Sequence, residues 1–169
     1  MMCDALALHQ AYQRGDLEAL KRLLGDPPDF PNCRGPTGVG EIVLEYAIYR
    51  SPLAFICVLL EQGADPSYQD HAGYPSLIAA LSSDRADRCQ LIELLLACGA
   101  DIQERGINDW TPLHYAAETD DLEGIELLVA HGADPNARTR IDDYATALEE
   151  AEHLGRAEAV GALRKLAPG

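Results

Sequence analysis

Histidine and cysteine are the residues of this sequence that could ligate a metal ion or act as catalytic groups. The 169 residues include five of each. The cysteines are odd in number, scattered and without a Cys-x-x-Cys pair, so their pattern favours neither a zinc site nor a disulfide framework and fits free thiols in a reducing compartment. An enzyme reading would require His71, His153 and Cys98 to meet around a metal in the folded chain.

Established catalytic and phosphate-binding motifs do not occur in full in this sequence. The sequence has no Gly-x-Ser-x-Gly, no Walker-type glycine loop and no His-Glu-x-x-His. A single Gly-x-Gly, at Gly38-Val39-Gly40, lacks the third glycine of a dinucleotide-binding turn. We therefore predict that the protein is not an enzyme and has no catalytic residue, cofactor or metal.

The charge balance is strongly acidic. Aspartate and glutamate total 28 against 13 lysine and arginine, a formal charge of −15, and the predicted isoelectric point is about 4.5. This balance argues against binding to nucleic acids or anionic membranes, whose phosphates require basic side chains. It favours a partner protein with a basic surface, although excess acid can also serve solubility alone.

Targeting and membrane-spanning segments are not indicated by the sequence. The first residues, Met-Met-Cys-Asp-Ala-Leu, lack a basic stretch and a long apolar core. Apolar runs all stay well short of the roughly 18 residues that a membrane span needs. We expect a cytoplasmic, unanchored protein that is monomeric on its own.

The elements that position these residues are repeated along the chain. A Gly-Ala-Asp phrase recurs at Gly63, Gly99 and Gly132, each time shortly after an apolar pair. A second phrase is best preserved in Thr111-Pro112-Leu113-His114-Tyr115-Ala116-Ala117. This copy and four degraded ones place the key leucines at 8, 44, 77, 113 and 148. Spacings near 33 to 36 residues are typical of a helical solenoid.

One repeat can be read as two short helices. Thr111 is suited to cap the first helix and Pro112 to occupy its first turn, while Leu113, Ala116 and Ala117 share one face. Gly132 can end the second helix because it readily adopts a left-handed backbone. Two such helices cannot bury their apolar faces alone, so they must stack on neighbouring copies.

The pattern resembles the ankyrin repeat, whose Thr-Pro-Leu-His-x-Ala signature is matched at Thr111 through Ala116. The resemblance implies an all-α ankyrin-repeat solenoid of stacked helix-turn-helix units joined by β-hairpin-like loops. It also implies that His9 and His114 make hydrogen bonds between repeats. We predict one domain over residues 1–169 with approximate repeats 4–36, 37–69, 70–105, 106–138 and 139–167, and a longer turn between the helices of the third.

The resemblance implies binding of a partner on the concave side, made by the loop tips and the exposed faces of the first helices. Trp110 and Tyr74 are large aromatic residues at these tips, where they could anchor a partner or pack on the next loop. Residues 101–152 hold fourteen acidic against three basic side chains, so the last two repeats should be negative. The predicted partner-binding residues are Tyr49, Arg50, His71, Tyr74, Asn108, Trp110, Glu118, Thr119, Asp142, Asp143 and His153.

The predicted function is non-catalytic protein–protein interaction with a partner that carries a basic patch. One alternative is an inhibitor or immunity protein that blocks a cationic enzyme such as a nuclease toxin. A self-assembling scaffold is a further class, because an open end of a solenoid can stack on a second copy.

Overall fold

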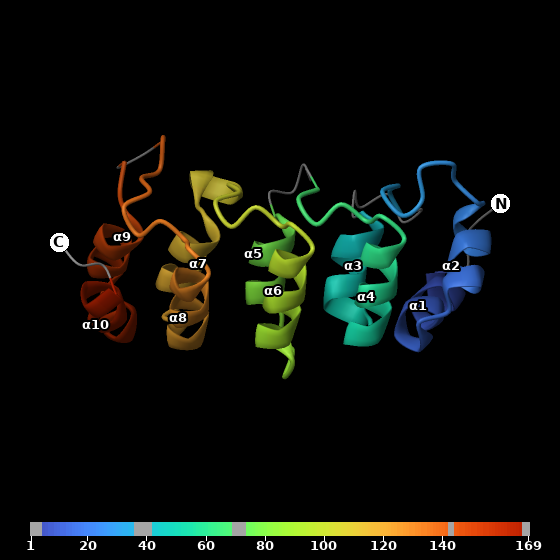
Figure 1. Cartoon of the computed structure of the whole chain (residues 1–169), viewed down its shortest axis with the longest axis horizontal. Coiled ribbons are helices and arrows are strands. Elements are labelled where there is room, and N and C mark those ends of the chain that lie inside the picture. Colours follow the sequence, from blue (N-terminus) through green and yellow to red (C-terminus); the bar gives the residue numbers. More distant parts are fainter. Residues whose placement is uncertain (1–4, 36–41, 69–73, 142–143, 167–169) are drawn as a thin grey trace. The chain divides into compact units, whose positions relative to one another are not determined.

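The computed structural model describes residues 5–35, 42–68, 74–141 and 144–166. Within these ranges the chain forms ten α-helices and one short 3-10 helix, with two isolated β-bridges and no longer strand (Figure 1). The all-α fold expected from the sequence is confirmed. The chain divides into two compact units, Met1–Ala100 and Asp101–Gly169, and each is described by itself.

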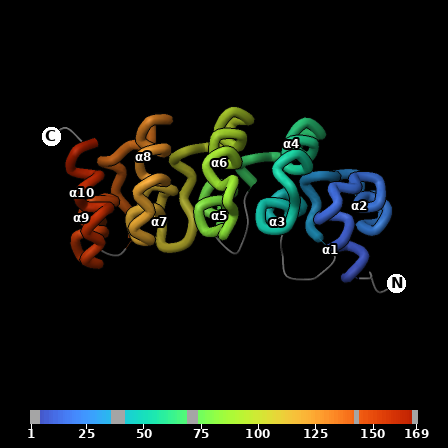
Figure 2. Tube along the Cα trace, turned by 90° about the horizontal axis from the view of Figure 1, so that it is seen from below, coloured from blue at the N-terminus to red at the C-terminus, as the bar shows by residue number. Residues whose placement is uncertain are grey.

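Unit 1 contains three helix pairs. The first helices of the pairs are α1 (Ala5–Arg14), α3 (Val43–Arg50) and α5 (Ser76–Ser82), and the second helices are α2 (Leu17–Leu24), α4 (Leu53–Glu61) and α6 (Arg88–Ala97). Helix α3 lies between α1 and α5 and contacts both, so the first helices form one row (Figure 2). Leu8, Leu44 and Leu77, the predicted key leucines of this unit, are at most 3% exposed.

Unit 2 contains two helix pairs. They are α7 (Pro112–Glu118) with α8 (Leu122–Ala130) and α9 (Ala147–Leu154) with α10 (Ala157–Leu166), preceded by the 3-10 helix η1 (Ile107–Asp109). Helix α7 packs on α9, and α8 packs on α10. Leu113 is 1% exposed, whereas Leu148, the corresponding leucine of the last repeat, is only half-buried.

Local sequence rules account for the helix ends of unit 2. Thr111 caps α7 and Pro112 occupies its first turn, while Leu113, Ala116 and Ala117 are buried. Gly132 has a φ of +93°, the left-handed conformation that a glycine after a helix readily supplies. These predictions are confirmed.

Among the described residues, two of the connections between pairs carry a hairpin-type bridge, as expected. Antiparallel bridges join Arg34 to Ile42 in unit 1 and Arg138 to Thr146 in unit 2. The turn between α5 and α6 spans residues 83–87, and Arg85 from this turn reaches back to α3. Among the described helices, none combines the length and apolar character that crossing a membrane requires.

Candidate functional site

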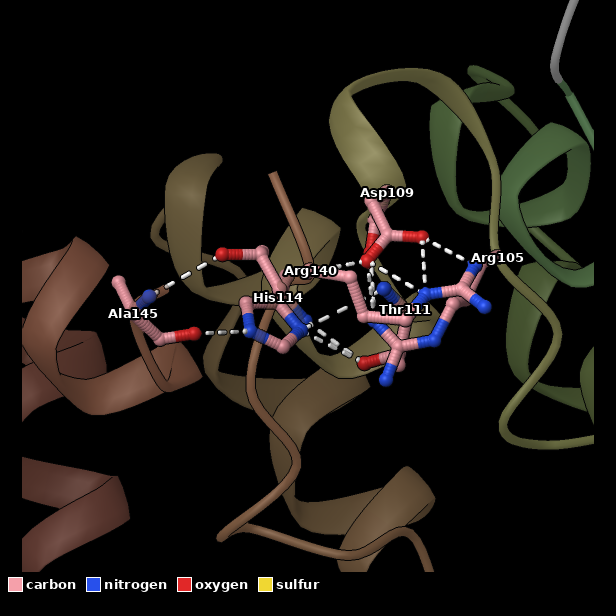
Figure 3. A network of polar contacts seen from close by, with 7 residues as sticks. Arg105, Asp109, Thr111, His114, Arg140 and Ala145 are labelled. Atoms are coloured by element: carbon pink, nitrogen blue, oxygen red, sulfur yellow. Dashed lines mark hydrogen bonds and ion pairs between the residues drawn. The ribbon is translucent and has the colours of Figure 1, made fainter. Parts of the chain in front are cut away.

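His114 connects α7 to the segment that leads into α9. Its Nε2 atom lies 3.1 Å from the carbonyl oxygen of Ala145. Because a carbonyl oxygen can only accept, Nε2 is the protonated ring nitrogen and its N–H donates this hydrogen bond. Nδ1 then accepts from Thr111, whose hydroxyl lies 2.8 Å away (Figure 3). Burial lowers the pKa of His114 below its ordinary value of 6.5. The role of this buried neutral histidine is therefore structural, and His9 similarly reaches Tyr46 of the next pair, 3.0 Å from its hydroxyl.

Asp109 is the centre of a second polar network, at the loop tip before α7 (Figure 3). Its carboxylate accepts from Arg105 Nη1 at 2.8 Å and from Arg140 Nε at 3.0 Å. The backbone N–H of Arg140 also donates to it, and the side chain of Asp109 is only 9% exposed. Hydrogen bonds from Arg140 hold the pKa of Asp109 below its ordinary range, with Arg105 contributing through its charge. We call Arg105, Asp109 and Arg140 the tip bracket.

The tip bracket holds backbone that is intrinsically unfavourable. Asn108 and Asp109 both have a φ of +58°, in the left-handed region that non-glycine residues seldom occupy. Asparagine and aspartate tolerate this region better than other residues do. The bracket therefore fixes the orientation of the tip and, with it, the position from which Asn108 and Trp110 project.

A hollow of about 320 Å³ lies beside the tip bracket in unit 2. Its walls come from the tip before α7, the loop before α9 and helix α9 itself. Ile141 and Leu154 are large apolar residues in the wall and are 49% and 40% exposed. The full lining is Asn108, Trp110, Thr139, Ile141, Glu150, His153 and Leu154.

Charges near the hollow are unequally paired. Glu149 accepts from Arg138 at 2.8 Å, and Glu152 accepts from Arg164 at 2.7 Å. The hydrogen bond from Arg138, followed by that from the Thr146 backbone, lowers the pKa of Glu149. Glu150 lies between these residues and lines the hollow, yet no ion pair involves it among the residues that the structure describes.

The structure brings together three of the residues predicted for partner binding. Asn108, Trp110 and His153 all line the hollow. Asn108 and His153 are exposed, and Trp110 is half-buried.

Other predicted residues lie elsewhere. Glu118 and Thr119 lie at the end of α7, where Glu118 is 3.8 Å from Arg156 and the Thr119 hydroxyl donates to the Tyr115 carbonyl. In unit 1, the Tyr49 hydroxyl lies 2.9 Å from the Ser82 hydroxyl and links α3 to α5. Arg50 is exposed at the end of α3 and Tyr74 is half-buried before α5. His71, Asp142 and Asp143 lie outside the described residues.

Sequence reasoning missed several residues of the hollow, of which Glu150, Ile141 and Leu154 matter most. Glu150, His153 and Leu154 stand at positions i, i+3 and i+4 of α9, so they share one face of that helix. This spacing could have indicated them once His153 was chosen. Within the described residues, no group of three histidine, cysteine or acidic side chains is placed to hold a metal ion.

Helix pairs that stack through their first helices and are joined by hairpin-like loops define a helix-turn-helix repeat protein. The family model described as "Ankyrin repeats (3 copies)" matches residues 44–139 and 77–167. The chain therefore belongs to the ankyrin-repeat family, as the sequence resemblance indicated.

Curated relatives share this region within much longer proteins. The chain is 29% identical over 133 residues to human BCL-6 corepressor-like protein 1, covering 77% of this chain and 7% of that protein. It is 34% identical over 141 residues to mouse RelA-associated inhibitor, covering 83% and 16%. It is 35% identical over 107 residues to the putative E3 ubiquitin-protein ligase XBAT34 of Arabidopsis thaliana, covering 62% and 27%. The chain thus spans about a quarter or less of the length of these relatives.

Proposed function

We propose that this chain is a non-catalytic module that binds a partner protein with a basic surface, and that the hollow of unit 2 is part of its binding surface. Ankyrin repeats are in general protein-binding modules. The relatives are named as a corepressor-like protein, an inhibitor and a ligase, and the part shared with this chain is the repeat region. A region shared by proteins with such different names fits a binding role better than a common reaction.

The observation that carries this proposal is the hollow itself. It places the sole tryptophan of the chain beside two exposed aliphatic side chains. Tryptophan is enriched among the residues that dominate binding energy at protein interfaces, especially where a neighbouring pocket excludes water. Tip, loop and α9 together offer such a pocket to a side chain of a partner.

Electrostatics support a basic partner. Residues 101–169 include fifteen acidic and six basic side chains, a formal charge of −9. The acidic excess steers a positively charged surface toward this unit and raises the association rate, most strongly at low salt. A stable complex should bury about 1,200 to 2,000 Å² in total, so the hollow would form only part of the interface.

Site-specific photo-cross-linking tests the location. A photoreactive phenylalanine analogue is placed at Ile141, in the hollow, or at Leu122, which is 40% exposed on α8 outside the hollow. We expect one basic protein from cell extract to be cross-linked from position 141 and not from position 122. Equal capture from both positions, or capture from 122 alone, would remove the hollow from the binding surface.

A further inference from the structure

We propose that the hollow of unit 2 receives a single arginine side chain of the partner, with its guanidinium against Trp110 and paired with Glu150. This inference rests on the proposed function and names the group that the site recognises. It is argued from the lining of the hollow, the pairing of the surrounding charges and the rigidity of the tip.

The lining suits a long side chain with an apolar stem and a cationic end. Ile141 and Leu154 supply aliphatic surface, and Trp110 supplies aromatic surface. Arginine buries its methylene groups along apolar surface while its planar head stacks on aromatic rings. A volume of about 320 Å³ is at the lower end of the range for ligand pockets, which favours one side chain over a larger ligand.

The pairing of the surrounding charges identifies the carboxylate that would bind the guanidinium. Glu149 and Glu152 are each bound by an arginine of this chain, and Asp109 is bound by two. Glu150 makes no ion pair with any described residue and is half-buried in the wall of the hollow. Because Glu150 is half-buried beside apolar side chains, its carboxylate is partly shielded from water, which strengthens a charged hydrogen bond to it.

The tip bracket prepares this arrangement before the partner arrives. Arg105 and Arg140 hold Asp109, so the neighbouring Asn108 and Trp110 are fixed relative to the loop that carries Ile141. Asn108 lines the hollow and has an amide oxygen that can accept from a guanidinium N–H. A rigid site loses less conformational entropy on binding, which favours recognition of one side chain.

The test uses the intrinsic fluorescence of the full chain, because Trp110 is its only tryptophan. Acetyl-Leu-Arg-Leu-amide is titrated against the same peptide with citrulline, which keeps the shape of arginine but has no charge. We expect the arginine peptide to change Trp110 emission and to bind about 3- to 10-fold more tightly, a gain close to that of an ion pair which stays partly exposed to solvent. Equal affinity for the two peptides, or unchanged emission with the arginine peptide, would overturn the proposal.

Matched variants of the protein assign the effect to the hollow. Glu150→Gln should reduce the preference for arginine over citrulline to about 2-fold or less, since the remaining amide cannot form an ion pair. Glu158→Gln removes the same charge from an exposed position on α10 outside the hollow and should preserve the preference. Equal loss in both variants would mean that only net charge matters, and the proposal would be wrong. Successful cross-linking at position 141 without a preference for arginine would leave the proposed function intact and remove only this inference.

Discussion

Each unit is built from the same kind of helix pair and contains an arginine network, and these two networks lie at different ends of the helices. In unit 2 the tip bracket lies at the loop end, where Asp109 collects two arginines. In unit 1 Arg85 lies at the opposite end, in the turn between α5 and α6, and donates to the carbonyl oxygens of Ile48 and Ser51 at 3.1 and 2.6 Å. Arg85 also pairs with Asp87, whose pKa is lowered by the hydrogen bond from Arg85.

The difference shows where rigidity is available for recognition. The network around Arg85 fixes the end of α3 and the turn before α6, away from the loop tips. The tip bracket fixes the tip that lines the hollow. Two arginines bind its Asp109 carboxylate, although a count of charges along the sequence includes that carboxylate in the negative surface. In unit 2 the internal arginines thus decide which acidic side chains are bound within the chain and which stay available for the proposed partner.

The largest effect should come from the apolar core within each unit. Leu44→Ala in unit 1 and Leu113→Ala in unit 2 each remove a side chain that is at most 1% exposed. We expect each to lower the free energy of unfolding by about 2–5 kcal/mol, through lost burial and the cavity that remains. Urea unfolding followed by circular dichroism measures both.

Leu148→Ala is the matched control for the core substitutions. Leu148 occupies the same position of its repeat but is only half-buried. It should cost less than about 2 kcal/mol, because its side chain loses less burial. A cost equal to that of Leu113→Ala would show that the last helix pair is as tightly packed as the preceding one.

The next effect concerns the two charged networks. Asp109→Asn keeps a residue that tolerates the left-handed backbone but removes the charge that Arg105 and Arg140 share. We expect a loss of about 1–3 kcal/mol, the range for charged hydrogen bonds. Arg85→Gln should cost a similar amount, since the Arg85 side chain is 12% exposed and two carbonyl oxygens lose their donor. A cost confined to one variant would break the comparison.

His114 should make unit 2 sensitive to mild acid. Because burial depresses the pKa of His114 below 6.5, the unfolded chain takes up the proton first as the pH falls. The stabilisation linked to neutral His114 is fully present above the pKa that this residue has in the unfolded chain. It is lost as the pH falls toward the lower pKa that His114 has in the folded chain. Between about pH 7.5 and 5.5 the free energy of unfolding should decrease, by at most about 1.4 kcal/mol per pH unit for this one group.

The control for the pH dependence is His114→Gln, which does not titrate. Its amide can still donate to the carbonyl oxygen of Ala145. Urea unfolding at the two pH values should show a smaller decrease for this variant than for the natural chain. An unchanged decrease would assign the acid sensitivity to other groups. Asp109 does not contribute to acid sensitivity between about pH 7.5 and 5.5. Because its pKa is lowered, the stabilisation that its charge provides is lost only as the pH falls below the ordinary value of 3.8.

Local rules explain why the sequence predicted the fold. Thr111, Pro112 and Gly132 act on backbone within a few residues, and the leucines and alanines of α7 mark its buried face by their spacing. These signals repeat with each helix pair, so five weak copies become one strong pattern. Leu148 departs from that pattern, since it is only half-buried.

The charged surface could not be predicted in the same way. Arg140 and Asp109 are 31 residues apart, and their pairing requires two loops to meet. Glu149 and Glu150 are adjacent in the chain and chemically alike, yet Arg138 binds the first and leaves the second in the wall of the hollow. Sequence position alone does not separate them, because the choice depends on which side of α9 faces the preceding loop.

The smallest effect should come from the exposed ion pair between Glu152 and Arg164. Their side chains are 43% and 64% exposed, against 9% for Asp109, so water already solvates both charges in the folded and unfolded chain. We expect Glu152→Gln to change the free energy of unfolding by less than about 1 kcal/mol, as is usual for surface pairs. Urea unfolding at low and at high salt measures this, and the difference between the two salts should be small. If Glu152→Gln proved as costly as Asp109→Asn, burial would not be what separates the two pairs. The tip bracket would then be one surface pair among several, and its role in fixing the hollow would lose its physical basis.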